Sequence, residues 1–312
     1  MAIDHVVVVG AGAIGSLYAA KLASHADVTV VARAAHVDAI NRDGLRVSGV
    51  ESFVARVTAT TRVERILPNT LVLLTTKVND NRQAIAPLAP RLRDDTTILC
   101  VQNGFGGEDL VRAAIGDSGP GVVVLRAITQ FGAIFREAGQ VDYKVAGQTL
   151  IERHARSTAV VELFNAAGLK GQISDAIAVD VWRKLIFNCV INPITSITGT
   201  DVGGIADSRL DPLKRLVIDE CLAVARAEGV YFDVDFVQAI ADVFSASRNI
   251  ASMRQDLLKG KPTEIGHMNG AVVALGARHG IACPVNAALT AIIKSMEHQP
   301  AQSPIPDPKS TM

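Results

Sequence analysis

Three polar side chains recur at intervals of four residues in a segment that is otherwise largely apolar. They are Lys184, Asn188 and Asn192, within the stretch Trp-Arg-Lys-Leu-Ile-Phe-Asn-Cys-Val-Ile-Asn-Pro at residues 182–193. On an α-helix, positions i, i+4 and i+8 lie close to one face, so these side chains form a single polar row. The other residues between 185 and 191 are hydrophobic, which predicts a helix that is buried almost all round.

A lysine and two amides in apolar surroundings need partners, because an unpaired polar group in a protein core is costly. The row therefore either belongs to an internal polar network or faces a ligand cleft. In a cleft, a protonated lysine could stabilise negative charge on a substrate oxygen and then transfer a proton to it. The two amides could bind and orient the substrate without neutralising the lysine.

A glycine-rich turn near the amino terminus predicts a bound dinucleotide. It follows the apolar residues 5–9 and precedes a helix-forming segment at 16–24, which is the context that this motif requires. The first glycine permits a tight turn, the second lets the backbone approach a pyrophosphate, and the third allows helix and strand to pack closely. Free N–H groups at the start of the helix would bind the phosphates. The residues of the turn are Gly10, Ala11, Gly12, Ala13, Ile14 and Gly15.

Arg33 follows the second predicted strand, where the residue type distinguishes the two nicotinamide cofactors. An acid at this place favours the ribose hydroxyl of NAD, whereas an arginine suits the 2′-phosphate of NADP in charge and geometry. No acid lies beside Arg33. The sequence therefore favours NADP, with a solvated surface arginine as the alternative interpretation.

Lys77 and Asn103 follow the next two predicted strands, at the edge of the sheet where ligands bind in such folds. Lys77 could contact a phosphate or ribose of the cofactor. Asn103, in the sequence Gln-Asn-Gly at 102–104, could bond the ribose or the nicotinamide end. A solvated lysine and an ordinary Asn-Gly turn are the alternative interpretations.

Another group of polar residues lies in the segment 251–265. Ser252 ends or lines a predicted helix there, and Thr263 could cap a helix that carries Glu264. For Ser252, the alternative is a hydrogen bond back to a carbonyl of its own helix. For Glu264, it is stabilisation of the amino-terminal end of a helix.

Strands alternate with helices over the first half of the chain, which predicts an open, mostly parallel sheet of the Rossmann type. A short hairpin is expected through 46–60, and the segment 121–151 should complete the sheet with antiparallel or mixed strands. The predicted buried strands are 5–9, 28–32, 70–75 and 97–101, and the predicted helices are 16–24, 35–43, 81–92 and 107–115.

The periodicity becomes helical near Asp175 and stays so to about residue 298. Breaks in the helical pattern are expected at Pro193, at 199–204, at Gly229 and at 259–262. The predicted fold is therefore α/β, with a Rossmann-type dinucleotide-binding sheet domain followed by an all-helical second domain. The expected organisation is an NADP-binding domain at 1–174, a helical substrate and catalytic domain at 175–298, and a flexible Pro-rich tail at 299–312.

The composition restricts the partners and the compartment. Lys plus Arg equal Asp plus Glu at 31 each, so no overall basic field predicts binding to nucleic acid or to an anionic membrane. The amino terminus lacks the pattern of a signal peptide, and no stretch is apolar enough to span a bilayer. The four widely spaced cysteines predict reduced core residues in a cytoplasmic protein, and the scattered histidines predict no metal site.

Together these motifs resemble the ketopantoate reductase (2-dehydropantoate 2-reductase) family, from Gly10 to about Pro284. The resemblance rests on the glycine turn, the Arg33, Lys77 and Gln-Asn-Gly positions, the Lys–Asn–Asn-Pro helix, and the Ser-Met and Thr-Glu-Ile pairs of 251–265. It implies an NADPH-dependent reduction of 2-dehydropantoate to pantoate, as in pantothenate biosynthesis. A same-family reductase of a different oxo acid is the nearer alternative, and a non-catalytic NADP-binding sensor is the more distant one.

The resemblance also implies a role for each residue. Lys184 would donate the proton, with Glu264 acting near the nicotinamide ribose and the reaction centre. Asn188, Asn192 and Ser252 would hold the carboxylate and hydroxyl groups of a small 2-oxo acid. Arg33 and Lys77 would bind the adenosine phosphate end of NADPH, and Asn103 would bridge cofactor and substrate. The apolar helices of the second domain could pack within one chain or across a homodimer.

Two segments depart from the pattern expected of the family. Val202 stands where relatives have a further substrate-binding asparagine, and the segment 125–133 differs at the inner end of the cofactor site. These departures concern the identity of the oxo acid and leave the reaction type unchanged.

Overall fold

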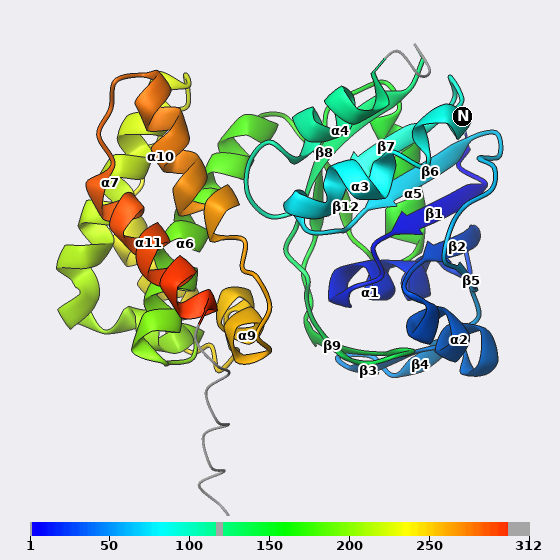
Figure 1. Cartoon of the computed structure of the whole chain (residues 1–312), viewed down its shortest axis with the longest axis horizontal. Helices are drawn as coiled ribbons and strands as arrows, with labels where there is room; N and C mark the ends of the chain where they lie inside the picture. The colour runs from blue at the N-terminus through cyan, green and yellow to red at the C-terminus, as the bar shows by residue number, and fades with distance from the viewer. Residues whose placement is uncertain (1, 117–120, 299–312) are drawn as a thin grey trace, which may run out of the picture. The chain divides into compact units, whose positions relative to one another are not determined.

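Two compact units, Met1–Asp180 and Val181–Met312, make up the chain (Figure 1). The structure is a computed structural model that describes residues 2–116 and 121–298. The predicted flexible tail at 299–312 lies outside the described residues. No helix of the described part of the chain is both long and apolar enough to cross a membrane.

The first unit is built on a mostly parallel sheet, as predicted, with the strand order β12-β11-β8-β7-β6-β1-β2-β5. The strands from β8 to β5 in this order are parallel, β11 is antiparallel to β8, and β12 is parallel to β11. Their bounds are β1 (His5–Val9), β2 (Asp27–Val31), β5 (Thr58–Thr60), β6 (Thr70–Leu74), β7 (Thr97–Cys100), β8 (Val123–Thr129), β11 (Thr149–Glu152) and β12 (Gly171–Ser174).

The strand order reverses direction between β1 and β6. From β1 the chain proceeds to β2 and β5 on one side, and then crosses to β6, β7 and β8 on the other. Ligands of open α/β sheets bind outside the carboxyl ends of the strands at such a reversal. Parallel pairing places the carboxyl ends of β1, β2, β6 and β7 at one edge, so this edge is where the dinucleotide is expected.

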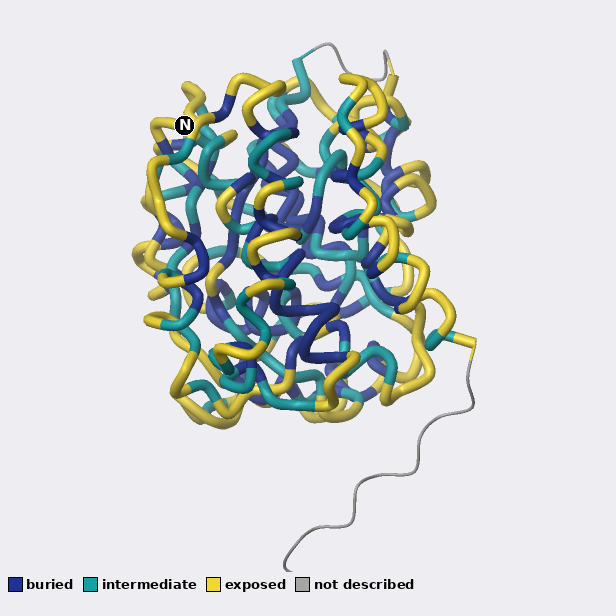
Figure 2. The backbone as a smooth tube through the Cα atoms, turned by 90° about the vertical axis from the view of Figure 1, so that its left-hand side faces the viewer, coloured by how far each residue is buried: buried dark blue, intermediate teal, exposed yellow. Residues whose placement is uncertain are grey.

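Helices cover both faces of this sheet. Alternate residues of a strand point to opposite faces, and in these strands both sets are apolar, so each face needs a covering layer. In β1, Val6 and Val8 belong to one hydrophobic core, whereas Val7 and Val9 belong to the other. The buried residues of both cores are dark blue in Figure 2. The first core includes α1 (Ala13–Leu22), α2 (Ala34–Asp43) and α5 (Ser157–Ala166), and the second includes α3 (Asn81–Ile85) and α4 (Gly107–Ile115).

A second, four-stranded sheet packs on α1 (Figure 1). It has the order β4-β3-β10-β9 and consists of β3 (Leu45–Gly49), β4 (Phe53–Ala55), β9 (Gly132–Glu137) and β10 (Gln140–Val145). The predicted hairpin is present as β3–β4, but β5 leaves it to pair with β2. The expectation that the segment 121–151 completes the main sheet was wrong for β9 and β10, which belong to the second sheet. The reason is that α1 is buried between the two sheets, so its apolar residues pack against both.

The segment 81–92, predicted as one helix, is divided in the structure. It contains the short α3, preceded by the 3₁₀ turn Val78–Asp80 and followed by the 3₁₀ turn Ala89–Arg91. Pro87 and Pro90 explain the difference, since proline cannot donate a backbone hydrogen bond and disfavours helix at the preceding residue.

Every element of the second unit within the described residues is helical, as predicted. The helices are α6 (Ile177–Thr198), which begins in the first unit, α7 (Asp211–Ala227), α8 (Phe236–Phe244), α9 (Ser252–Leu258), α10 (Asn269–Arg278) and α11 (Pro284–Glu297), with 3₁₀ turns at Val202–Ala206, Ser208–Leu210 and Ile265–His267. Of the expected breaks, the one at Pro193 was wrong, because α6 continues through this residue.

Tertiary contacts explain why α6 is not interrupted. Pro193 has no N–H, so the carbonyl of Cys189, four residues earlier, has no helical donor. The side-chain amide of Asn269 on α10 donates to this carbonyl at 3.0 Å. The same amide donates to Asn286 Oδ1 at 2.9 Å, and Asn286 Nδ2 in turn donates to Glu220 Oε2 at 2.7 Å. A buried polar network thus connects α6 to α10, α11 and α7.

We predict that Asn269→Ala lowers the free energy of unfolding by about 1–3 kcal/mol, because it leaves the Cys189 carbonyl buried without a donor. In a Pro193→Ala background the new N–H can supply this bond, so the same substitution should cost about 1 kcal/mol less. Urea denaturation of the four proteins measures this difference. Equal costs in both backgrounds would show that the Asn269 amide does not substitute for the missing N–H.

Candidate functional site

The glycine turn lies at the carboxyl end of β1, and its geometry leaves room for a ligand. Gly10 has φ +95°, and a side chain there would contact Thr76 at 2.6 Å. A Cβ on Gly15 would lie 2.4 Å from the Gly10 carbonyl. Gly12, by contrast, is exposed, and a Cβ there would meet no atom within 4 Å. The first and third glycines are thus required by packing, while the second opens the backbone to an approaching group.

The start of α1 is suited to an anion. Gly12 is the N-cap of α1, which has no side-chain cap and no acid in its first turn. Because the first N–H groups of a helix lack intrahelical acceptors, such an end attracts phosphate. These features fit the pyrophosphate of a dinucleotide.

Arg33 lies beside the glycine turn in space, as parallel pairing requires. Val31, at the end of β2, pairs with Val9 and accepts a hydrogen bond from Gly10 N at 3.3 Å. Arg33 follows two residues later as the exposed N-cap of α2. Its guanidinium and the helix start therefore form a positively polarised region next to the turn.

A buried histidine, missed in the sequence, connects these two parts of the edge. His36 lies in the first turn of α2, and its Nδ1 accepts from Gly139 N at 2.8 Å. A neutral ring then carries its hydrogen on Nε2, which donates to Ser16 Oγ at 3.2 Å. Ser16 Oγ donates to the Ala11 carbonyl at 3.2 Å. The imidazole thus fixes the glycine turn relative to the Arg33 end of α2.

Lys77 and Asn103 are half-buried at the ends of β6 and β7, on either side of a polar network. Gln102 Nε2 donates to the Thr76 carbonyl at 2.8 Å, and Asn81 Nδ2 donates to Gln102 Oε1 at 2.9 Å. These bonds hold the two loops together at one edge. The Lys77 loop therefore adjoins the glycine turn, where Thr75 Oγ1 donates to the Gly10 carbonyl at 2.7 Å. The Asn103 loop adjoins the Lys77 loop through Gln102.

In the second unit, the predicted polar row lies along α6. Lys184 and Asn188 are half-buried, and Asn192 is buried, where its amide lies 3.7 Å from Met268 Sδ. The hydroxyl of Ser196 donates to the Asn192 carbonyl at 2.7 Å. The helix is less completely enclosed than its apolar pattern suggested, because the row reaches the surface of the unit at its Lys184 end.

Ser252 and Val202 are brought near one another by backbone pairing between their loops. Val202 N donates to the Asn249 carbonyl at 2.8 Å, and Gly203 N donates to the Ser247 carbonyl at 2.8 Å. Ser252 begins α9 and is exposed, whereas Val202 is buried. The loop after α6 and the start of α9 therefore form one local structure.

Glu264 precedes a 3₁₀ turn, not a full helix as expected. Thr263 Oγ1 accepts from Ile265 N at 3.3 Å, and its hydroxyl donates to Glu297 Oε1 at 2.5 Å. Thr263 therefore fixes the backbone beside Glu264, and Glu264 itself is half-buried. The described geometry thus groups the predicted residues in two sets, one in each unit.

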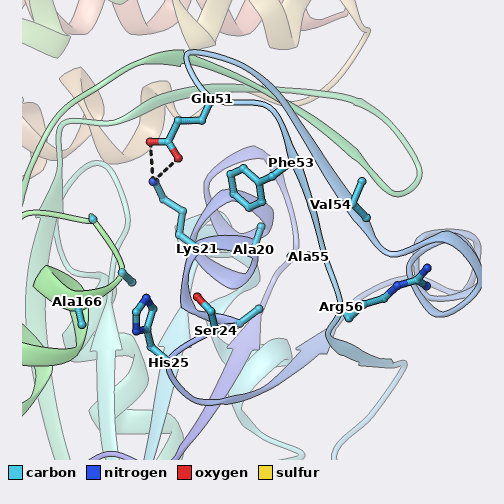
Figure 3. Close-up of a pocket in the computed structure, with 13 residues that line it drawn as sticks. Ala20, Lys21, Ser24, His25, Glu51, Phe53, Val54, Ala55, Arg56 and Ala166 are labelled. Atoms are coloured by element: carbon cyan, nitrogen blue, oxygen red, sulfur yellow. Dashed lines mark hydrogen bonds and ion pairs between the residues drawn. The ribbon is translucent and has the colours of Figure 1, made fainter.

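A separate pocket of about 660 Å³ lies in the first unit (Figure 3). It is lined by the carboxyl-terminal end of α1, the β3–β4 hairpin and the turn after α5. Lys21 Nζ donates to both oxygens of Glu51 at its wall, at 2.8 and 2.9 Å. Because the glycine turn precedes the other end of α1, this pocket is distinct from the expected dinucleotide site.

Comparisons with known proteins agree over nearly the whole chain. Residues 6–156 match the family described as Ketopantoate reductase PanE/ApbA, and residues 176–297 match Ketopantoate reductase PanE/ApbA C terminal. The chain is 33% identical to the 2-dehydropantoate 2-reductase of Pyrococcus horikoshii over 300 residues, which cover 94% of this chain and 97% of that protein.

Two solved structures are similar across both units. A PanE/ApbA family ketopantoate reductase from Ralstonia eutropha JMP134 superimposes with a TM-score of 0.87 at 31% identity, covering 94% of this chain and 98% of that one. D-mandelate dehydrogenase, in a ternary structure with NADH and anilino(oxo)acetate, superimposes with a TM-score of 0.86 at 25% identity and the same coverage.

We predict a pH dependence of stability from His36. Burial lowers the pKa of His36 below its ordinary value of 6.5. The unfolded chain therefore binds more protons below pH 6.5, so the free energy of unfolding falls as the pH drops from 6.5 through the folded-state pKa. A His36→Asn variant keeps an acceptor for Gly139 N but does not titrate.

Between about pH 7.5 and 5.5, the free energy of unfolding should fall less in this variant than in the parent protein. Urea denaturation at several pH values measures this difference. An equal dependence of the unfolding free energy on pH in the two proteins would contradict this role of His36.

Proposed function

Since the chain belongs to the ketopantoate reductase PanE/ApbA family, we propose that it reduces 2-dehydropantoate to pantoate with NADPH. The reaction class follows from the family: the chain is an oxidoreductase that acts on a CH–OH group. The main observation that supports this substrate and cofactor is the row of Lys184, Asn188 and Asn192 on α6. The other unit has a glycine turn that is suited to phosphate.

The first unit would hold the cofactor. The backbone N–H groups of Ala13, Ile14 and Gly15 would bind the pyrophosphate at the start of α1. The N–H of Gly12 already donates to the Gly10 carbonyl at 2.8 Å. Arg33 would pair with the 2′-phosphate, and Lys77 would contact the same adenosine phosphate end. Bound NADPH would supply the hydride for the reaction.

The second unit would supply the acid and the substrate contacts. Lys184 would stabilise the negative charge that develops on the ketone oxygen and donate a proton from Nζ to it. The amides of Asn188 and Asn192 and the hydroxyl of Ser252 would bind the carboxylate and hydroxyl groups of the substrate. Glu264 would act near the nicotinamide ribose, and Asn103 of the first unit would bridge cofactor and substrate.

A second candidate is the reduction of a different 2-oxo acid by the same residues. Val202 favours it, because a buried aliphatic side chain cannot replace the hydrogen bonds of the asparagine expected there. The similarity to D-mandelate dehydrogenase, solved with anilino(oxo)acetate, is consistent with an apolar substituent next to the oxo acid group.

An NADPH-oxidation assay with a panel of 2-oxo acids, ketopantoate and phenyl-substituted acids included, tests these candidates. We expect turnover of ketopantoate, and in Lys184→Ala a fall in kcat of about 10²- to 10⁴-fold with NADPH binding retained. The exposed Lys294→Ala serves as the matched control. Faster turnover of an apolar 2-oxo acid would favour the second candidate, and NADPH binding without turnover of any acid in the panel would contradict both candidates.

For the cofactor, we predict that Arg33→Ala weakens NADPH binding by about 10- to 100-fold, because a charge-assisted hydrogen bond to the 2′-phosphate is lost. Binding of NADH, which lacks this phosphate, should change little. Fluorescence titration of both cofactors measures the ratio, with the exposed Arg278→Ala as the control. Equal losses for both cofactors would reject the 2′-phosphate role.

A further inference from the structure

Arg126 is a buried arginine beside the loop that carries Asn103. Its side chain is only 5% exposed. On β8 it pairs with Cys100 of β7, two residues before the loop begins at Gln102. It also lies within 125–133, one of the two segments that are expected from the sequence to differ from the family pattern.

The guanidinium binds the loop on both sides of Asn103. Arg126 Nη2 donates to the Gln102 carbonyl at 3.0 Å and to the Gly104 carbonyl at 2.6 Å. One planar group thus fixes the carbonyls of the two residues on either side of Asn103. Hydrogen bonds from a charged donor are stronger than neutral ones, so this contact restrains the backbone at that residue.

Neighbouring groups make this buried cation stable. Arg126 Nη1 donates at 2.9 Å to Oε2 of Glu108, which lies in the first turn of α4. The backbone N–H of Arg126 donates to Glu152 Oε2 at 2.9 Å. An unpaired charge at this depth would be costly. A Cβ on Gly107 would lie 2.7 Å from Gln102 Oε1 and 3.5 Å from Arg126 Nη1, so the glycine there leaves room for the arrangement.

The loop needs such a restraint because its own backbone is permissive. Gly104 has φ +80° and Gly106 has φ +79°, and glycine loses more conformational freedom on folding than any other residue. The Gln102 side chain anchors the loop to Thr76 and Asn81 on the β6 side. Arg126 provides the anchor on the β8 side, and Asn103 lies between the two.

We propose that Arg126 is a positioning residue for the reduction, holding Asn103 in the orientation in which its amide contacts cofactor and substrate. The inference rests on the proposed function, which gives Asn103 that contact. In this role Arg126 would act through the backbone of the loop and would itself contact neither ligand. Lysine in its place would keep the charge next to Glu108, but a single ammonium group cannot match the planar arrangement of guanidinium donors.

The test compares Arg126→Lys with Arg112→Lys. Arg112 is another arginine next to β8. Its Nη2 donates to the Val124 carbonyl and its Nη1 donates to Asp109 Oδ1, both at 3.1 Å, and neither partner belongs to the Asn103 loop. We expect Arg126→Lys to lower kcat for the oxo acid by about 10- to 100-fold. Arg112→Lys should retain the activity of the parent protein.

A double-mutant cycle separates positioning from a merely structural effect. If Arg126 acts through Asn103, then Arg126→Lys should have little further effect on kcat in an Asn103→Ala background. A similar fall in kcat in both backgrounds would overturn the proposal. Unchanged kcat in Arg126→Lys would overturn it as well.

Hydrogen exchange provides a readout that does not depend on turnover. The amides of 102–106 should exchange faster in Arg126→Lys than in the parent protein and in Arg112→Lys. Unchanged exchange would show that Arg126 does not restrain the loop, and so would reject the proposal. If the parent protein reduces no 2-oxo acid, the proposed function fails, while this comparison still decides whether Arg126 holds the loop.

Discussion

The carbonyl of Cys189 has no helical donor, and the helix that carries Lys184 depends on how this group is satisfied. A proline inside a helix costs roughly 3 kcal/mol, in part through such a lost bond. Asn269 supplies the replacement, and its amide is linked through Asn286 to Glu220. Glu220 also accepts from the first N–H groups of α11. The polar row therefore lies on a helix that is held by side-chain hydrogen bonds to α10, and through α10 to α11 and α7, as well as by its own backbone hydrogen bonds.

The first unit relies on a similar principle at the carboxyl edge of its sheet. Parallel strands bring several loops to one edge, but loops have little intrinsic order and must be held by side chains. Here buried polar groups perform that function. His36 connects the glycine turn to α2, Gln102 connects the loops after β6 and β7, and Arg126 connects the latter loop to β8. In each case a side chain satisfies backbone groups that would otherwise be buried without partners.

Family membership and substrate identity rest on different residues. Similarity spans both units, and it includes the helix with the lysine and the two amides. A hydride transfer to a 2-oxo acid needs only the cofactor edge, an acid and carboxylate contacts. Discrimination between oxo acids depends on the rest of the pocket, where a missing hydrogen bond can change preference strongly. Under the proposed function Val202 belongs to that second set, so it would bear on the substrate and not on the reaction type.

Local pattern was enough to predict the parallel sheet, the glycine turn at its reversal, the all-helical second unit and the row of three polar residues, spaced four apart, on α6. These follow from periodicity and from glycine geometry, each of which acts over a few neighbouring residues, and from the general rule that alternating strands and helices form a parallel sheet. The local pattern did not predict that α6 continues through Pro193 or that a separate sheet packs on α1. It also did not predict the roles of His36, Asn269 and Arg126. Each depends on a partner distant in sequence: Asn269 lies 80 positions from Cys189, and Arg126 lies 22 and 24 from the carbonyls it binds. Only the tertiary structure brings such partners together, because no local spacing encodes which buried donor will meet which unsatisfied carbonyl.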